Sequence, residues 1–292
     1  MSFWKSKAER GSAPLIRLIA WLARTVGRPL CRALLLPIVA YFVATDPVAR
    51  RASREFLAAA RGRRARLTEV FAHLHWFGAT LLDRVYMAGG EFGRFAVSVE
   101  GDALVRRALE PGKGCVLLGS HLGSFDLMML ANRAISDLPI HVLMHVDPRS
   151  RVRRIAGIDD SGLQVIALGR PDSFLRAYEV LERGGIVAAL ADRTDGGSAC
   201  LSSDFFGRSA SFPLGPHVLA ARAGASVLMC FGLYEGAARY RIEFVEFGPA
   251  APAHSRGAAL QPVVDRYAAT LERYARRTPN NWFNFYPYWA DR

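Results

Sequence analysis

Between residues 95 and 247, short apolar runs alternate with helical stretches, and this alternation narrows the possible folds more than any other feature. The runs Cys115–Gly119 and Ile186–Ala191 have strand length and no charged side chain, which is typical of fully buried strands. Two later runs, Val227–Tyr234 and Tyr240–Phe247, are typical of a strand pair. The pattern therefore predicts an α/β domain, with a mostly parallel, mixed sheet flanked by helices on both faces.

The remaining elements follow from helical spacing and turn residues. Asp46-Pro47 predicts a helix start, because aspartate caps first-turn amides and proline fits the first helical position; this helix should stop near Gly62. Further strands are expected at Phe95–Val99, Ile140–Met144 and Gln164–Leu168. Further helices are expected at Thr68–Met87, Asp102–Leu109, Phe125–Ser136, Asp172–Arg183, Leu214–Ala223 and Gln261–Arg277.

The chain has 292 residues, 51% of them hydrophobic, which suffices for one large core and excludes collagen-like and disordered classes. We expect a helical arm over residues 1–45 and one domain over 46–292, helical in 46–93 and α/β in 94–292. The four cysteines lie far apart, so reduced thiols in a cytoplasmic compartment are expected rather than disulfides or zinc ligands.

Positive charge is concentrated at the N-terminal end. Up to Arg66 the chain has 14 Lys and Arg against 3 Asp and Glu, whereas the other 226 residues have 24 against 23. A basic arm on a nearly neutral body predicts an anionic partner. The arm is too apolar for a nucleic-acid tail, and no zinc, homeodomain or RNA-recognition motif accompanies its arginines, so we expect anionic lipid and no nucleic acid.

The apolar arm extends from Pro14 to Thr45, but its longest charge-free run, Ala33–Thr45, has only 13 residues. A helix needs about 20 apolar residues to span a bilayer. Pro29 and Pro37 are expected to interrupt the segment. We therefore expect an interfacial or re-entrant anchor on the cytoplasmic leaflet. A helix pair on the surface of a soluble domain is the alternative.

A candidate catalytic pair follows the buried strand Cys115–Gly119. His121 stands just beyond the strand, and Asp126 lies five residues later at an expected helix start. Catalytic groups of open α/β sheets collect at the carboxyl ends of strands. A neutral imidazole can accept a hydroxyl proton, a carboxylate can orient it, and Gly123 permits a tight turn between them. A structural loop histidine capped by Asp126 is the alternative interpretation.

These residues resemble a known family. His121-x4-Asp126 is similar to the H-x4-D/E motif of the glycerolipid acyltransferase superfamily. Ala191-Asp192-Arg193, Phe205-Phe206-Gly207, Gly215-Pro216 and Pro279–Trp289 resemble, in order and spacing, the bacterial lipid A biosynthesis (lauroyl/myristoyl) acyltransferases. That family more often has glutamate at position 126 and glutamine at position 193. Relatives of this type also accompany aryl-polyene clusters, so the acyl chain is left open.

The resemblance implies a glycerol-3-phosphate acyltransferase-like fold and a membrane-associated bacterial O-acyltransferase. Its donor would be an acyl-carrier-protein or coenzyme A thioester, with no other cofactor, and its acceptor a lipid hydroxyl. His121 would take the hydroxyl proton while Asp126 holds the ring. The implied location is the cytoplasmic face of the inner membrane, with anionic lipids, a lipid acceptor and acyl carrier protein as partners.

The resemblance also implies substrate-binding residues. Arg170 and Arg193 would bind phosphate or a developing oxyanion, and Asp192 would organise Arg193 or a neighbouring loop. Phe205-Phe206-Gly207 would line the acyl groove. The alternatives are surface salt bridges for the arginines, a turn residue for Asp192, and core aromatics for the phenylalanines.

The sequence also bears on other classes of site and function. A metal is not expected, because His141 and His145 would lie about 13 Å apart on one strand. A lipid- or carrier-binding protein without catalysis, and a thioesterase, are the alternative functions.

Overall fold

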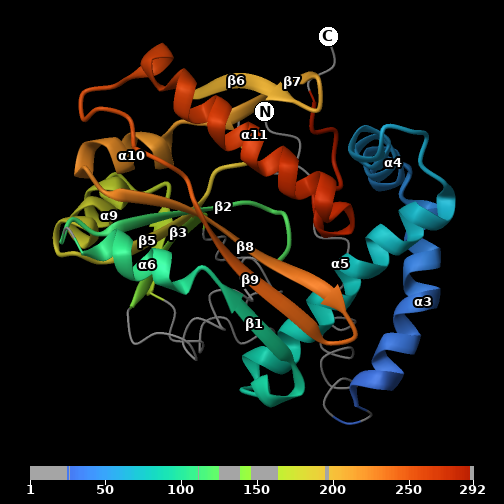
Figure 1. Cartoon of the computed structure of the whole chain (residues 1–292). Helices are drawn as coiled ribbons and strands as arrows, with labels where there is room; N and C mark the ends of the chain where they lie inside the picture. Colours follow the sequence, from blue (N-terminus) through green and yellow to red (C-terminus); the bar gives the residue numbers. More distant parts are fainter. Residues whose placement is uncertain are drawn as a thin grey trace.

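The computed structural model describes residue 25 and residues 27–110, 112–124, 139–145, 164–194 and 197–289. Seven strands form its central sheet: β1 (Ala96–Glu100), β2 (Cys115–Gly119), β3 (Ile140–His145), β4 (Gln164–Leu168), β5 (Ile186–Leu190), β8 (Ser226–Gly236) and β9 (Arg239–Glu246). Their order across the sheet is β1-β9-β8-β2-β5-β3-β4 (Figure 1).

The sheet is mixed, with a parallel centre. Strands β8, β2, β5, β3 and β4 are parallel to their neighbours in that order. β9 pairs antiparallel with β8, and β1 pairs parallel with β9 at the edge. This confirms the α/β prediction and the strand pair expected near residues 227–247.

Helices cover both faces of the sheet. Alternate side chains of a strand point to opposite faces, so a strand that is apolar throughout needs a packed layer on each face. Helices α9 (Ser173–Glu182), α10 (Gly215–Ala223) and α11 (Gln261–Arg277) contribute to the core that contains Val116 and Leu118 of β2. Helix α6 (Asp102–Leu109) packs on the other core, which contains Cys115 and Leu117. One uninterrupted apolar strand thus serves two cores.

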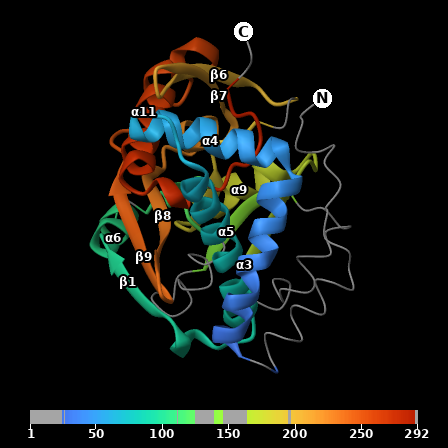
Figure 2. The same cartoon turned by 90° about the vertical axis from the view of Figure 1, so that its right-hand side faces the viewer.

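Three N-terminal helices lie against one side of this domain: α3 (Arg28–Thr45), α4 (Pro47–Arg61) and α5 (Leu67–Ala88). Figure 1 and Figure 2 both place α3 alongside α5. Asp46 caps α4 as expected, its carboxylate accepting a hydrogen bond from the amide of Ala49. The expected interruption at Pro37 is wrong: α3 is one helix through this residue, and Pro29 lies in its first turn, where no amide donor is needed.

A buried polar network fastens α3 to the domain. The guanidinium of Arg28 binds both oxygens of the fully buried Asp83 carboxylate, at 2.7 and 2.9 Å. The hydroxyl of Tyr240 donates to Asp83 at 2.7 Å, and Arg32 donates to the hydroxyl of Tyr234 at 2.7 Å. Two arginines of the arm therefore point into the protein.

The sequence pattern does not predict the β-hairpin that lies beside α11. It consists of β6 (Cys200–Phe205) and β7 (Arg208–Pro213), joined at Phe206 and Gly207. Both turn residues have positive φ, 61° and 73°, as a tight hairpin turn requires. Phenylalanine is an unusual residue at such a position, so the sequence lacks the usual Asn-Gly signal. Short 3₁₀ turns at Phe92–Arg94, Gly257–Leu260 and Pro279–Asn281 complete the described elements.

His73 joins α5 to α4 and to the C-terminal segment. The side chain is fully buried, with Nδ1 at 2.8 Å from Ser53 Oγ and Nε2 hydrogen-bonded to the carbonyl of Trp282. Burial lowers the pKa of His73 to about 4. The unfolded chain therefore binds a proton at pH 5 that the folded chain does not, and stability falls as pH decreases below about 6.5.

We expect His73 to contribute about 2 kcal/mol to the loss of unfolding free energy between pH 7 and pH 5. Urea unfolding of the native chain and of His73→Gln, each at pH 7 and pH 5, measures this loss of unfolding free energy. The loss should be smaller in the variant by that amount. An equal loss in both proteins would contradict this role of His73.

Candidate active site

The parallel pairing of β2 and β5 brings two polar side chains to one edge of the sheet. The strands end in register, with Gly119 opposite Leu190, and the amide of Ala191 donates to the carbonyl of Gly119 at 3.1 Å. His121 and Asp192 each lie two residues beyond these strand ends. This edge is where open α/β sheets collect their reactive groups.

His121 is held by Asp192 through two hydrogen bonds. Its Nδ1 lies 2.9 Å from Asp192 Oδ1, and its backbone amide donates to Oδ2 at 3.0 Å. The His121 side chain is 28% exposed, whereas that of Asp192 is fully buried. The imidazole can thus meet a substrate while its carboxylate partner is shielded from solvent.

The charge of Asp192 determines the tautomer of His121. Burial acts to raise the pKa of Asp192, but the charge and hydrogen bonds of His121, with the charge of Arg193, outweigh burial and lower it to about 2. An ionised carboxylate only accepts hydrogen bonds, so the proton of the neutral imidazole is on Nδ1. The lone pair is then on Nε2, as a general base requires.

Asp192 is itself fixed by the C-terminal segment. The side-chain amide of Asn284 donates to Asp192 Oδ2 at 3.2 Å, and the hydroxyl of Tyr288 donates to the Asp192 carbonyl at 2.8 Å. In the sequence, this segment stands out only by its resemblance to the family's ending. The signal for a site role was the presence of amide side chains within an aromatic stretch.

The loop after β2 is held from two sides. The amide of Gly123 donates to the carbonyl of Asn281 at 2.7 Å, and the amide of Phe283 donates to the carbonyl of His121 at 2.8 Å. Gly123 has a φ of 83°, and a Cβ there would lie 2.2 Å from the carbonyl oxygen of Gly232. Only glycine fits, so the turn expected at Gly123 is also a close backbone contact with β8.

Asp126 lies outside the described residues, and its expected contact with His121 remains a prediction. Asp192, which the sequence suggested as an organiser of Arg193 or a neighbouring loop, contacts both the side chain and the backbone amide of His121 in the loop after β2. Arg193 extends toward the C-terminal segment: its guanidinium donates to Asn284 Oδ1 and to the carbonyl of Phe283, and lies 5.3 Å from the Tyr286 ring centroid.

Arg170 is not brought to this pair. It follows β4, three strands from β2, which corresponds to about 14 Å across the sheet. Its exposed guanidinium lies 3.5 Å from the carboxylate of Asp172.

Phe205 and Phe206 are buried beneath the C-terminal segment, and Gly207 is exposed at the hairpin turn. The ring of Phe205 lies 5.4 Å from that of Trp282, and its carbonyl accepts a hydrogen bond from the Trp289 indole. Trp282 forms a β-bridge with Leu122, next to His121. This aromatic cluster packs against the C-terminal segment that contacts the loop of His121. A contact of the two phenylalanines with an acyl chain remains a prediction.

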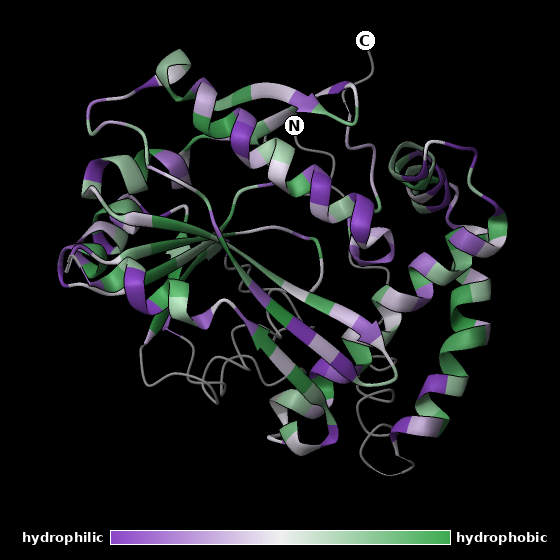
Figure 3. Cartoon of the chain, viewed as in Figure 1, coloured by the Kyte–Doolittle hydropathy of each residue, from purple (hydrophilic) through white to green (hydrophobic). Residues whose placement is uncertain are grey.

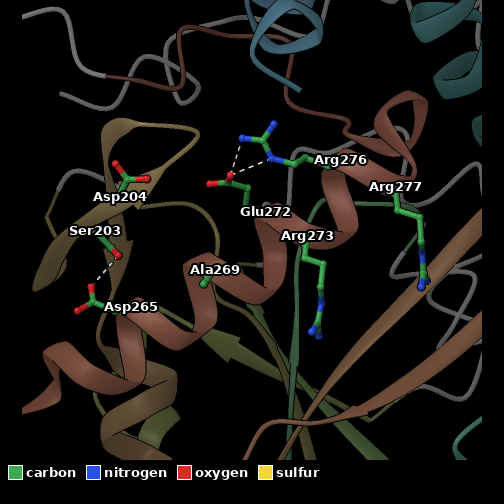
Figure 4. A pocket seen from close by; sticks show the side chains of 8 residues that line it. All are labelled: Ser203, Asp204, Asp265, Ala269, Glu272, Arg273, Arg276 and Arg277. Atoms are coloured by element: carbon green, nitrogen blue, oxygen red, sulfur yellow. Dashed lines mark hydrogen bonds and ion pairs between the residues drawn. The ribbon is translucent and has the colours of Figure 1, made fainter. Parts of the chain in front are cut away.

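A polar groove of about 910 Å³ lies between the β6–β7 hairpin and α11 (Figure 4). None of the residues around His121 lines it. Several of its polar side chains pair with one another: Ser203 donates to Asp265, and Arg276 binds Glu272, both at 2.7 Å. The His121–Asp192 pair is therefore the better candidate for chemistry.

Comparison with known proteins identifies the family of this chain. The family model described as bacterial lipid A biosynthesis acyltransferase matches residues 84–291. Two relatives from strains of Mycobacterium tuberculosis, each named phosphatidylinositol mannoside acyltransferase, are 29% identical over 189 residues. The match covers 62% of this chain and 56% of each relative, so the chain spans little more than half of their length. The resemblance is confirmed: the chain belongs to the bacterial lipid A biosynthesis acyltransferase family.

Proposed function

We propose that this protein transfers an acyl chain from an acyl-carrier-protein or coenzyme A thioester to a lipid hydroxyl. His121 is the general base, and Asp192 is its positioning residue. The observation that carries the proposal is the pairing of a partly exposed imidazole with a fully buried carboxylate at the carboxyl edge of the sheet. The lipid acceptor agrees with the family and with the names of the relatives.

The proposed reaction needs no covalent acyl-enzyme, because a thioester is already activated. Nε2 of His121 removes the proton from the acceptor hydroxyl as its oxygen attacks the thioester carbonyl. The new C–O bond forms, the C–S bond breaks, and the proton passes from the imidazolium to the departing thiolate. Asp192 stabilises the imidazolium between these steps, and Asp126 is retained as a further positioning residue.

We also propose that α3 lies in the cytoplasmic leaflet of the inner membrane. Among the described helices, α3 is the one with the length and apolarity to cross a membrane, with 18 residues and a mean hydropathy of 1.4 (Figure 3). One face packs on the domain through Cys31 and Val39, while Leu30, Leu34 and Tyr41 are exposed on the opposite face. A helix bound to its own domain along one face suits an interfacial position better than a span.

A transfer assay tests the reaction. Purified protein is incubated with radiolabelled acyl-carrier-protein or coenzyme A thioesters and a bacterial lipid extract, and the products are separated. We expect labelled lipid that forms only when protein and extract are both present. Release of free acid without extract would identify a thioesterase instead, and no product with either donor would favour a binding protein.

A further inference from the structure

A cavity of about 610 Å³ lies where α3, α4 and α5 meet. None of the residues around His121 lines it. Its apolar wall consists of Ala40, Val43, Ala44, Leu67 and Phe71. Its polar lining consists of Arg50, Arg54 and Thr68.

The cavity is positively charged. Arg50 and Arg54 are four residues apart on α4, so both side chains project from the same face of the helix. No acidic side chain is among the lining residues. The nearest carboxylates along the chain are engaged elsewhere: Asp46 caps α4, Glu55 pairs with Arg208, and Glu69 binds arginines in the stretch 61–66. An anion in the cavity would meet two guanidinium groups and no competing carboxylate.

The two arginines are held differently. Arg50 donates from Nη1 to the last-turn carbonyls of α3, Val43 at 2.6 Å and Ala44 at 3.1 Å, which fixes its position. The Nε of Arg54 is shielded from solvent and has no acceptor in the part of the chain that the structure describes. A buried donor without an acceptor is costly, and a bound anion would relieve this cost.

The residues that line the cavity indicate which chemical groups the ligand has besides its negative charge. Guanidinium groups match the planar geometry of phosphate oxygens, and the N-terminus of α5 adds a favourable field for an anion. Beside them, Val43 and Phe71 offer an apolar surface, and Leu67 at the rim is 52% exposed. The cavity also adjoins the last turns of α3, where Tyr41 and Phe42 are exposed. An anionic group attached to an aliphatic chain would match both the arginine side chains and the apolar wall of the cavity.

We propose that this cavity binds one anionic glycerophospholipid, with its phosphate between Arg50 and Arg54 and an acyl chain along Val43 and Phe71. The site holds the protein to a lipid of the membrane surface. This proposal rests on the membrane association in the proposed function, but lipid binding at the site requires neither a thioester donor nor acyl transfer.

Calorimetric titration with monomeric short-chain lipids tests the site. Three probes are titrated into the full chain and compared: dihexanoyl phosphatidylglycerol, dihexanoyl phosphatidylcholine and inorganic phosphate. We expect 1:1 binding of the phosphatidylglycerol, at least about tenfold tighter than that of either other probe, because only this lipid combines a net charge with acyl chains. Equal binding of inorganic phosphate would overturn the lipid assignment, and no binding of the phosphatidylglycerol would overturn the site.

Matched variants locate the binding. Arg54→Gln should weaken phosphatidylglycerol binding at least about tenfold, whereas Arg51→Gln, which removes an exposed charge of the same helix, should change it less than about twofold. Leu67→Asp is a second variant, since an acidic residue suits the first turn of α5 and would repel the phosphate. Leu67→Asn is its neutral control and should bind more tightly than Leu67→Asp. Equal effects of Arg54→Gln and Arg51→Gln would contradict the proposal.

The variant His121→Ala, which we expect to lose acyl transfer, separates this site from catalysis. It should bind the phosphatidylglycerol as tightly as the native chain. In the native chain, acyl transfer without lipid binding would refute the site alone, and lipid binding without any acyl transfer would refute the reaction alone.

Discussion

Replacing His121 with alanine is expected to lower acyl transfer to lipid about 10²–10⁴-fold, the usual contribution of a positioned general base. The reason is that the imidazole is the partly exposed, carboxylate-bound proton acceptor at the carboxyl edge of the sheet. The measurement is the initial rate of labelled lipid formation from the thioester donor at saturating lipid.

Two controls make this result specific. Circular dichroism and the urea midpoint establish that His121→Ala is folded. His254→Ala removes an exposed histidine from another loop and should keep the native rate. A rate for His121→Ala within a few-fold of native would eliminate the proposed base.

Replacing Asp192 with asparagine should lower kcat by about 10²–10⁴-fold and change KM little, because the substitution alters the orientation of the base rather than a substrate contact. The asparagine has the same shape but no negative charge, so it no longer requires the proton on Nδ1 of His121 or stabilises the imidazolium. Asp172, a partly exposed carboxylate that pairs with Arg176, provides the matched control Asp172→Asn.

The pH profile separates a positioning role from a structural one. Activity is lost as pH falls and the catalytic imidazole becomes protonated. Removing the buried negative charge of Asp192 makes protonation harder, so the acid limb should move to lower pH in Asp192→Asn. Asp192→Glu, which keeps the charge, should restore part of the lost rate. An unmoved limb together with a near-native kcat would show that Asp192 does not act on the base.

Local patterns in the sequence sufficed for most elements. The strands Cys115–Gly119 and Gln164–Leu168 and the helices Asp102–Leu109 and Gln261–Arg277 have the expected bounds. Their apolar periodicity is a local property that the fold preserves. The expected interruption at Pro37 was wrong, since α3 continues through this residue. Packing of α3 on α5 compensates for the amide hydrogen bond that proline cannot make.

The β6–β7 hairpin shows a different limit. Its turn places Phe206 at a φ of 61°, a conformation that phenylalanine rarely adopts by itself. The amide of Phe206 donates to the Glu272 carboxylate at 2.5 Å, and the ring of Phe206 lies 5.7 Å from that of Phe56. Contacts with distant residues thus stabilise a turn that no local signal predicts.

The sequence by itself determined the α/β class, the order of the elements outside the β6–β7 hairpin and the position of His121, because each depends on neighbouring residues. It also carried the motif order that identifies the family. The tertiary structure decided which carboxylate in the described chain holds that histidine. Asp192 lies 71 residues from His121, and only the pairing of β5 with β2 brings them together. Strand order depends on which apolar faces pack best across the whole domain, and no local spacing encodes it.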